Sequence, residues 1–184
     1  EMHLPNLKLV TAEETGLIDS LSKMMGASFL EEGWTKVWLS VLDDIGTSPE
    51  RKLEISQAII RYNFTVGAPY GCVYALEDQS AAAGGYLSSD LKGEVWTNLE
   101  DKSFELLCEQ ELSPDEKKAL IEISEEMKFI SNFSWMYEEV DDLDFIHYFA
   151  IGVDPHKRGS GALRRLFTPF LEYATNHHIN CYLE

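Results

Sequence analysis

The sequence predicts a single α/β domain over residues 1–184, in which strands and helices alternate along the chain. The length is that of one domain, and 45% of the residues are hydrophobic, which is enough for a full core. Segment 145–153 is almost entirely apolar, as expected for a strand covered on both faces. Segment 161–176 follows it with apolar residues at helical spacing.

The first half of the chain predicts two helices, a short strand and a hairpin. Thr11 and Glu14 have the spacing of a capping box, so a helix should start there. Ser48 followed by Pro49 indicates a second helix start, since serine caps free amides and proline is tolerated in the first turn. Strands are expected at 7–10, 72–76 and 81–87, the last two joined by a turn at 78–80.

A helical insertion is expected at 99–130, a stretch rich in charged residues. Its clearest boundary is Ser113-Pro114, where Glu116 completes a capping box. The simplest interpretation of the charge is a solvated pair of helices. Five carboxylates follow before the next strand and form either a rim that attracts cations or a plain exposed loop: Glu138, Glu139, Asp141, Asp142 and Asp144.

The last 40 residues predict a strand, a helix and a strand. The helix at 161–176 contains Pro169, which should leave the carbonyl of Arg165 without its usual donor. Segment 179–183 is the final strand candidate.

The composition excludes several classes of protein. The chain carries 15 basic and 32 acidic residues, a net charge of -17, which argues against binding to nucleic acid or to an anionic membrane. The cysteines are far apart and form no C-x-x-C pair, so neither zinc nor redox chemistry is indicated and no metal is expected. No apolar run approaches the ~20 residues of a membrane span. We therefore expect a cytoplasmic protein without membrane or nucleic-acid partners.

Segment 153–163 carries the strongest chemical signal. Gly159 and Gly161 allow a tight turn whose amides point outward, and the start of a helix adds partial positive charge. Four basic residues lie within nine positions of an otherwise acidic chain: Lys157, Arg158, Arg164 and Arg165. This pattern favours a phosphate ligand, although it matches neither the Walker loop nor G-x-G-x-x-G. The alternative is an ordinary glycine turn with solvated arginines.

These residues resemble the GNAT superfamily of acetyl-CoA-dependent N-acetyltransferases. The family signature, R/Q-x-x-G-x-G/A after a strand ending in V-x-P, is similar to Val153-Asp154-Pro155 followed by the segment 158–163. Leu163 stands where the family has a small residue. The segment 180–184 looks like the P-C-Y-L-E strand of the branch that includes puromycin N-acetyltransferase.

The resemblance implies one mixed sheet flanked by helices, a helical insertion before the fourth strand, and an acetyl-CoA-binding core at 145–184. The backbone of Ile151, Gly152 and Val153 would pair with the pantetheine arm of the cofactor. The pyrophosphate and 3′-phosphate would be held by the turn that follows and by its basic side chains, and Arg165 would support Arg164 there. The residues implied for phosphate binding are Arg158, Gly159, Ser160, Gly161, Ala162, Leu163 and Arg164.

Two residues are candidates for the acid–base chemistry. His147 in the fourth strand could take the proton of the amine, because imidazole titrates near neutrality; the alternative is a satisfied core histidine. Glu184 at the end of the fifth strand could bind or deprotonate the amine; the alternative is a solvated strand end.

The implied reaction is acetyl transfer from acetyl-CoA to the primary amine of a small molecule. The net charge favours a cationic acceptor. The rival functions are an acyl-CoA-binding or sensing module without turnover and an unrelated binder of nucleotide phosphates.

Members of the family continue beyond the fifth strand. We therefore expect the 184-residue form to be truncated there, or completed by a neighbouring chain in a possible homodimer, because the fifth strand would otherwise present an open edge. Such a form should bind coenzyme A but turn over poorly.

Overall fold

The computed structural model describes residues 1–128, 130, 134–139 and 144–183. Its centre is a five-stranded sheet in the order β1-β2-β3-β4-β5. The first four strands pair antiparallel, and β4 pairs with β5 in parallel, so the expected mixed α/β sheet is confirmed. The strands are β1 Lys8–Leu9, β2 Val73–Ala75, β3 Ala81–Leu87, β4 Phe145–Val153 and β5 Asn180–Leu183.

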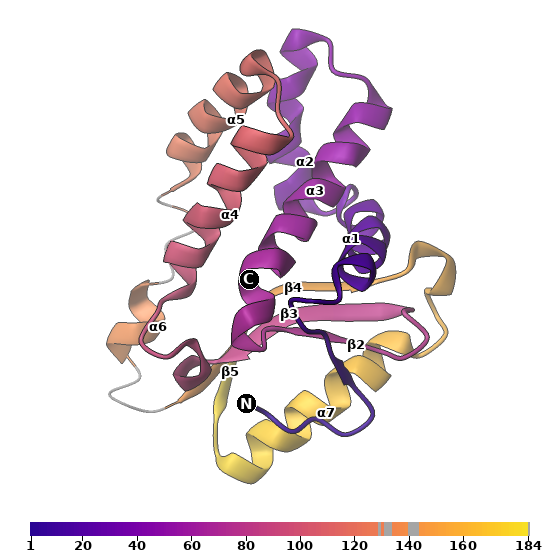
Figure 1. Ribbon diagram of the computed structural model, residues 1–184, viewed down its shortest axis with the longest axis vertical. Helices are drawn as coiled ribbons and strands as arrows, with labels where there is room; N and C mark the ends of the chain where they lie inside the picture. The colour runs from indigo at the N-terminus through magenta and orange to yellow at the C-terminus, as the bar shows by residue number, and fades with distance from the viewer. Residues whose placement is uncertain (129, 131–133, 140–143, 184) are drawn as a thin grey trace.

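Helices cover both faces of the sheet (Figure 1). One face carries α7 and the N-terminal segment, and the other carries the remaining helices, of which α2, α4 and α5 extend beyond the sheet. The helices are α1 Thr15–Phe29, α2 Gly33–Ser40, α3 Pro49–Gly67, α4 Trp96–Gln110, α5 Pro114–Met127, α6 Ser134–Glu139 and α7 Ala162–His177. In the described part of the chain, no helix combines the length and apolar character that crossing a membrane requires.

Each face of the sheet has its own apolar core. On the α7 side, Tyr74, Tyr148 and Phe170 are buried together, and the ring of Phe170 lies edge-on to both tyrosines at 5.2 Å. On the opposite side, Met25 of α1 and Phe64 of α3 pack over the sheet. The sheet is therefore buried on both faces, which explains why β4 is almost entirely apolar.

Local capping signals predicted two helix starts correctly. The hydroxyl of Ser48 accepts the amide of Arg51 at 3.1 Å, and α3 begins at Pro49. Ser113 and Glu116 form the expected capping box, and α5 begins at Pro114. Helices α4 and α5 occupy most of the range expected for the helical insertion.

Two expectations at the N-terminus differ from the structure. The carboxylate of Glu14 accepts the amide of Thr11 at 2.9 Å, but these residues close a turn, and α1 begins only at Thr15. Helix α2 was not anticipated from the sequence. Its cap is Glu32, whose carboxylate accepts the amides of Trp34 and Thr35, and glutamate is not among the usual capping residues.

A β-bulge interrupts the pairing of β3 with β4. Gly84 is opposite Ala150 and Gly85 is opposite Tyr148, so Phe149 is the extra residue on β4. As a result, Phe149 and Ala150 both pack on the side of α1 and α3, whereas Tyr148 and Ile151 pack on the side of α7. The bulge thus resets the alternation of side chains for the end of β4.

Gly84 makes room for the ring of Phe149. A Cβ atom on Gly84 would lie 2.2 Å from the ring of Phe149, which is itself stacked on Trp96 at 3.6 Å between centroids. We therefore expect Gly84→Ala to lower the free energy of unfolding by about 1–3 kcal/mol, because the ring cannot move away without losing its stack. Urea denaturation followed by circular dichroism measures this loss.

Gly33→Ala is the matched control, since nothing lies within 4 Å of a Cβ atom at that position. It should change the stability by no more than about 0.5 kcal/mol. Equal stabilities for the two variants would contradict the packing argument.

Candidate functional site

The edge of β4 becomes free where β5 ends. β5 pairs with residues 145–148 of β4, and residues 149–153 face no strand on that side in the described part of the chain. On the other side, the amide of Asp154 donates to the carbonyl of Ser80 at 2.8 Å. Because hydrogen-bonded pairs alternate along an antiparallel ladder, the N–H and C=O groups of Ile151 and Val153 point away from β3 toward the free edge. This edge can accept an extended ligand that carries amide groups.

The free edge leads into the glycine turn. Residues Pro155–Lys157 form one turn of 3-10 helix, and the carboxylate of Asp154 accepts the amide of His156 at 2.9 Å. Gly159 and Gly161 then adopt φ angles of 77° and 83°, in the left-handed region. Nothing lies within 4 Å of a Cβ atom at either glycine, so the backbone conformation, and not space, requires them.

The start of α7 presents a set of backbone amides without acceptors. The amide of Ser160 donates to Lys157, and that of Arg165 donates to Gly161. Among the described residues, the amides at 158, 159 and 161–164 have no backbone acceptor. Residues 156–161, 163 and 164 are exposed, so this segment is open to solvent except at Ala162, which is buried. A helix start with free amides binds anions, and phosphate groups in particular.

Basic side chains lie beside these amides. Lys157, Arg158 and Arg164 are exposed, and none of them forms an ion pair with another described residue. Arg158 also helps to lower the pKa of Glu31, although the main cause of that shift is Lys36. Leu163, the departure from the family signature, is 48% exposed, so its side chain is not accommodated in the core. We call the amides of 158, 159 and 161–164, together with these three cations, the α7 cradle.

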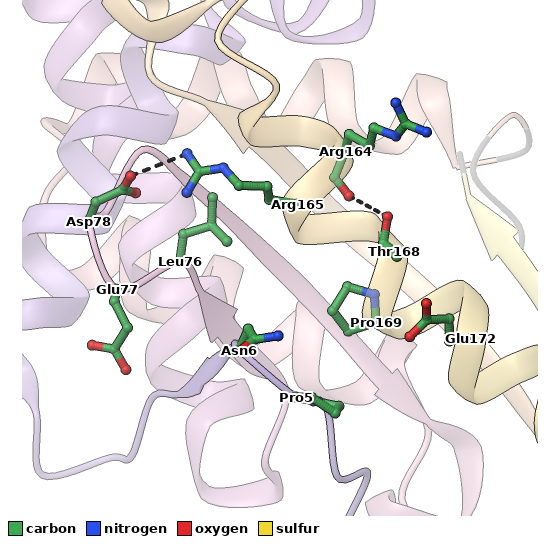
Figure 2. Close-up of a pocket in the computed structure, with 10 residues that line it drawn as sticks. All are labelled: Pro5, Asn6, Leu76, Glu77, Asp78, Arg164, Arg165, Thr168, Pro169 and Glu172. Carbon is green, nitrogen blue, oxygen red and sulfur yellow. Dashed lines mark hydrogen bonds and ion pairs between the residues drawn. The ribbon is translucent and has the colours of Figure 1, made fainter.

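Arg165 and Arg164 are directed to different surroundings. Its guanidinium lies 3.2 Å from the carboxylate of Asp78 and 3.4 Å from the hydroxyl of Ser80. Figure 2 shows the guanidinium groups of Arg164 and Arg165 pointing in opposite directions. The Ser80 hydroxyl, the Ser80 amide and then Arg165 hold the pKa of Asp78 at about 2. The pairing of the two arginines on one phosphate is therefore not supported.

The pocket in Figure 2 borders the α7 cradle, because Arg164 belongs to both. It has a volume of about 610 Å³ and lies between α7, the turn after β2 and the N-terminal segment. Its lining includes Pro5, Leu76, Thr168 and Pro169, and no residue of β4 or of the glycine turn. Of the predicted cofactor-binding residues, all of which are described, only Arg164 lines this pocket.

His147 is 1% exposed and lies on the side of β4 opposite to α7. Its Nδ1 atom is 2.8 Å from the hydroxyl of Tyr86, and the two rings meet edge to face at 5.3 Å. Burial lowers the pKa of His147 to about 4, so the imidazole is neutral at pH 7. In the ladder it is opposite Tyr182, one residue before the pairing of β4 with β5 ends.

The acidic candidates are only partly described. Glu184 and residues 140–143 lie outside the described residues, as do the side chains of Glu138 and Glu139. The carboxylate of Asp144 accepts the hydroxyl of Ser88 and both the amide and the hydroxyl of Ser89, at 2.9–3.0 Å. Asp144 therefore joins β4 to the segment after β3, which does not require a ligand.

Sequence reasoning missed the partners of His147. The hydroxyl of Tyr86 on β3 bonds His147 and also lies within hydrogen-bond distance of Tyr137 on α6. The amide of Trp96 on α4 donates to Tyr137, although the residues of each bonded pair are far apart along the chain. No spacing or motif links these residues, because only the folded sheet and its helices bring them together.

Comparisons with known proteins do not extend the family resemblance. No model of a known protein family matches the chain, and a search of curated proteins finds no significant relative. The function is therefore argued from the geometry of β4, the glycine turn and α7.

The buried imidazole predicts a loss of stability in mild acid. The pKa of His147 is about 4 in the folded chain and near 6.5 when the chain is unfolded, so the unfolded chain binds more protons between these values. The contribution of neutral His147 to the free energy of unfolding is fully present above pH 6.5 and is lost as the pH falls toward 4. It amounts to about 2 kcal/mol between pH 7 and pH 5.

Urea titrations at pH 7 and pH 5 measure this effect, and His147→Gln should reduce the difference between them by that amount. Should His147→Gln not fold, the NMR titration of His147 in the wild-type chain should have its midpoint near pH 4. A midpoint above 6 would contradict the burial argument.

Proposed function

We propose that the protein transfers an acetyl group from acetyl-CoA to the primary amine of a small, cationic acceptor. The observation that carries the proposal is the continuity of the free edge of β4 with the α7 cradle. Coenzyme A has an arm with two amides and ends in phosphates, so its parts match an open strand edge followed by a cluster of amide donors. The resemblance of segment 145–184 to GNAT enzymes supports the same interpretation.

The described residues suit each part of this ligand. The backbone groups of Ile151 and Val153 would bond the pantetheine arm as a neighbouring strand does. The α7 cradle would bind the pyrophosphate through hydrogen bonds donated by its backbone amides. Arg158 and Arg164 would add charge-assisted hydrogen bonds. Bound acetyl-CoA would supply the thioester carbonyl that the amine attacks.

The protein must also position the acceptor and remove a proton. Holding the amine near the thioester carbonyl converts a bimolecular reaction into an effectively unimolecular one. An ammonium group must lose a proton before it attacks, and His147 is the described candidate closest to the point where β4 and β5 separate. The net charge of -17 favours a cationic acceptor over an anionic one.

The second candidate function is an acyl-CoA-binding or sensing module without turnover. The burial of His147 favours it, because its imidazole is only 1% exposed, whereas a base that contacts an acceptor is ordinarily more accessible. The two functions share the α7 cradle and differ only in the release of free coenzyme A.

Thermal unfolding in the presence of candidate ligands tests the proposal. Acetyl-CoA at 100 times its dissociation constant should stabilise the fold by about 2.7 kcal/mol and raise the unfolding midpoint. ATP at the same concentration should raise it less, because ATP has no arm to pair with β4. A shift with ATP and none with acetyl-CoA would refute the proposal in favour of a nucleotide binder.

A thiol-release assay then separates the two acyl-CoA functions. Polyamines and aminoglycosides should release free coenzyme A faster than anionic amines do. Acetyl-CoA binding without thiol release from any amine would support the binding module.

Reversing the charge of Arg158 should weaken coenzyme A binding. Arg158→Glu removes one cation from the α7 cradle and adds an anion, so we expect roughly a tenfold loss of affinity at low ionic strength and a smaller loss at high salt. Isothermal titration calorimetry in two salt concentrations measures both effects.

Lys118→Glu makes the same change of charge on an exposed position of α5, away from α7 (Figure 1). It should leave the affinity almost unchanged. Equal affinities for wild type and Arg158→Glu at low salt would show that this basic cluster binds no phosphate.

A further inference from the structure

A chain of hydrogen-bonding groups leads from His147 to the protein surface. The hydroxyl of Tyr86 lies 2.8 Å from Nδ1 of His147 and 3.5 Å from the hydroxyl of Tyr137. His147 and Tyr86 are each 1% exposed, whereas Tyr137 is 39% exposed. The three groups therefore connect the interior of the sheet to solvent through β4, β3 and α6.

Packing holds the two tyrosines in place. The ring of Tyr86 is stacked on Trp96 at 5.9 Å, and the ring of Tyr137 lies edge-on to Phe145 at 5.2 Å. The backbone amide of Trp96 also donates to the hydroxyl of Tyr137 at 3.5 Å. This amide belongs to the first residue of α4, where the helix offers no acceptor, so Tyr137 satisfies it. The hydroxyl oxygen of Tyr137 can thus accept from the Trp96 amide and from Tyr86 while its own proton goes to water.

Burial keeps the two inner groups of this hydrogen-bonded path, Tyr86 and His147, neutral at pH 7. Burial is the main cause that raises the pKa of Tyr86, and Tyr137, Cys72 and Glu100 raise it further. Burial also lowers the pKa of His147. Such groups pass a proton along without holding a charge, which suits them to conduct protons and not to store them.

We infer that Tyr86 and Tyr137 are positioning residues that connect the imidazole of His147 to solvent, so that the proton of the acceptor amine leaves on this path. This inference rests on the proposed acetyl transfer. In that step the amine nitrogen bonds to the thioester carbon and the carbon–sulfur bond breaks, with the electron pair leaving on sulfur. The amine proton passes to Nε2 of the imidazole, and the Nδ1 proton passes to the hydroxyl of Tyr86. Tyr86 passes its own hydroxyl proton to Tyr137, and Tyr137 passes its own to water, so each group ends neutral.

The location of His147 agrees with this role. It pairs with Tyr182 just before β4 loses its second neighbour, so the inner end of the chain of hydroxyls lies next to the free edge. The outer end, at Tyr137, lies on α6, on the face of the sheet that is opposite to α7 (Figure 1). Proton release is thereby separated from the binding of phosphate at the α7 cradle.

NMR of the chain with ¹⁵N-labelled histidine tests the connection without any turnover. The ring N–H proton of His147 should exchange with water roughly tenfold more slowly in Tyr137→Phe than in the wild type, because the hydroxyl path is cut. Tyr182→Phe is the matched control: it loses a hydroxyl from the same aromatic cluster, where its ring contacts Trp135 and Phe145. Its exchange rate should equal that of the wild type.

An exchange rate in Tyr137→Phe equal to that of the wild type would overturn the inference. Tyr137 is partly exposed, so this variant should fold even if the buried Tyr86→Phe does not. In steady-state assays, Tyr137→Phe should lower kcat by roughly tenfold and leave KM for acetyl-CoA unchanged. A failure of wild-type protein to bind acetyl-CoA would refute the proposed function, whereas normal binding with unchanged exchange and kcat in Tyr137→Phe would refute only the proton path.

Discussion

The contact of Phe149 with Gly84 controls how the end of β4 is presented. The ring fills the space that a side chain on Gly84 would occupy and stacks on Trp96, which fixes the bulge in place. Without the extra residue, every later side chain of β4 would turn to the other face. Gly152 would then leave its position under Met25, where a Cβ atom would lie only 3.0 Å from the methionine side chain. The free edge depends on this register.

The distribution of ion pairs shows how an acidic protein could hold the proposed anionic ligand. Several cations elsewhere are already neutralised: both carboxylate oxygens of Glu116 accept from Arg51 at 2.9 and 3.0 Å, and Lys8 lies 2.8 Å from Glu14. Lys157, Arg158 and Arg164 have no such partner among the described residues. A local positive field next to free amides attracts phosphate even though the long-range field of the chain opposes it, because salt screens distant charges more than near ones.

Local signals in the sequence predicted the elements that frame the site, and tertiary contacts decided the rest. The bounds of β4 and the left-handed turn before α7 followed from apolar runs and glycines, which act within a few residues. The bulge at Phe149 and the bond between His147 and Tyr86 did not, since each depends on residues more than 60 positions apart. Arg165 shows the same limit: its neighbour in the sequence is Arg164, but its partner in the fold is Asp78.

The turn between β2 and β3 links the sheet to the α7 cradle. The carbonyl of Ser80 accepts the amide of Asp154 just before the glycine turn, and Arg165 of α7 returns to Asp78 and the Ser80 hydroxyl. The two ends of the glycine turn are thus attached to one short segment. A single exposed ion pair contributes little to stability. Two attachments on one rigid turn nevertheless fix the distance between the end of β4 and the start of α7, and this distance determines whether one extended ligand can reach both.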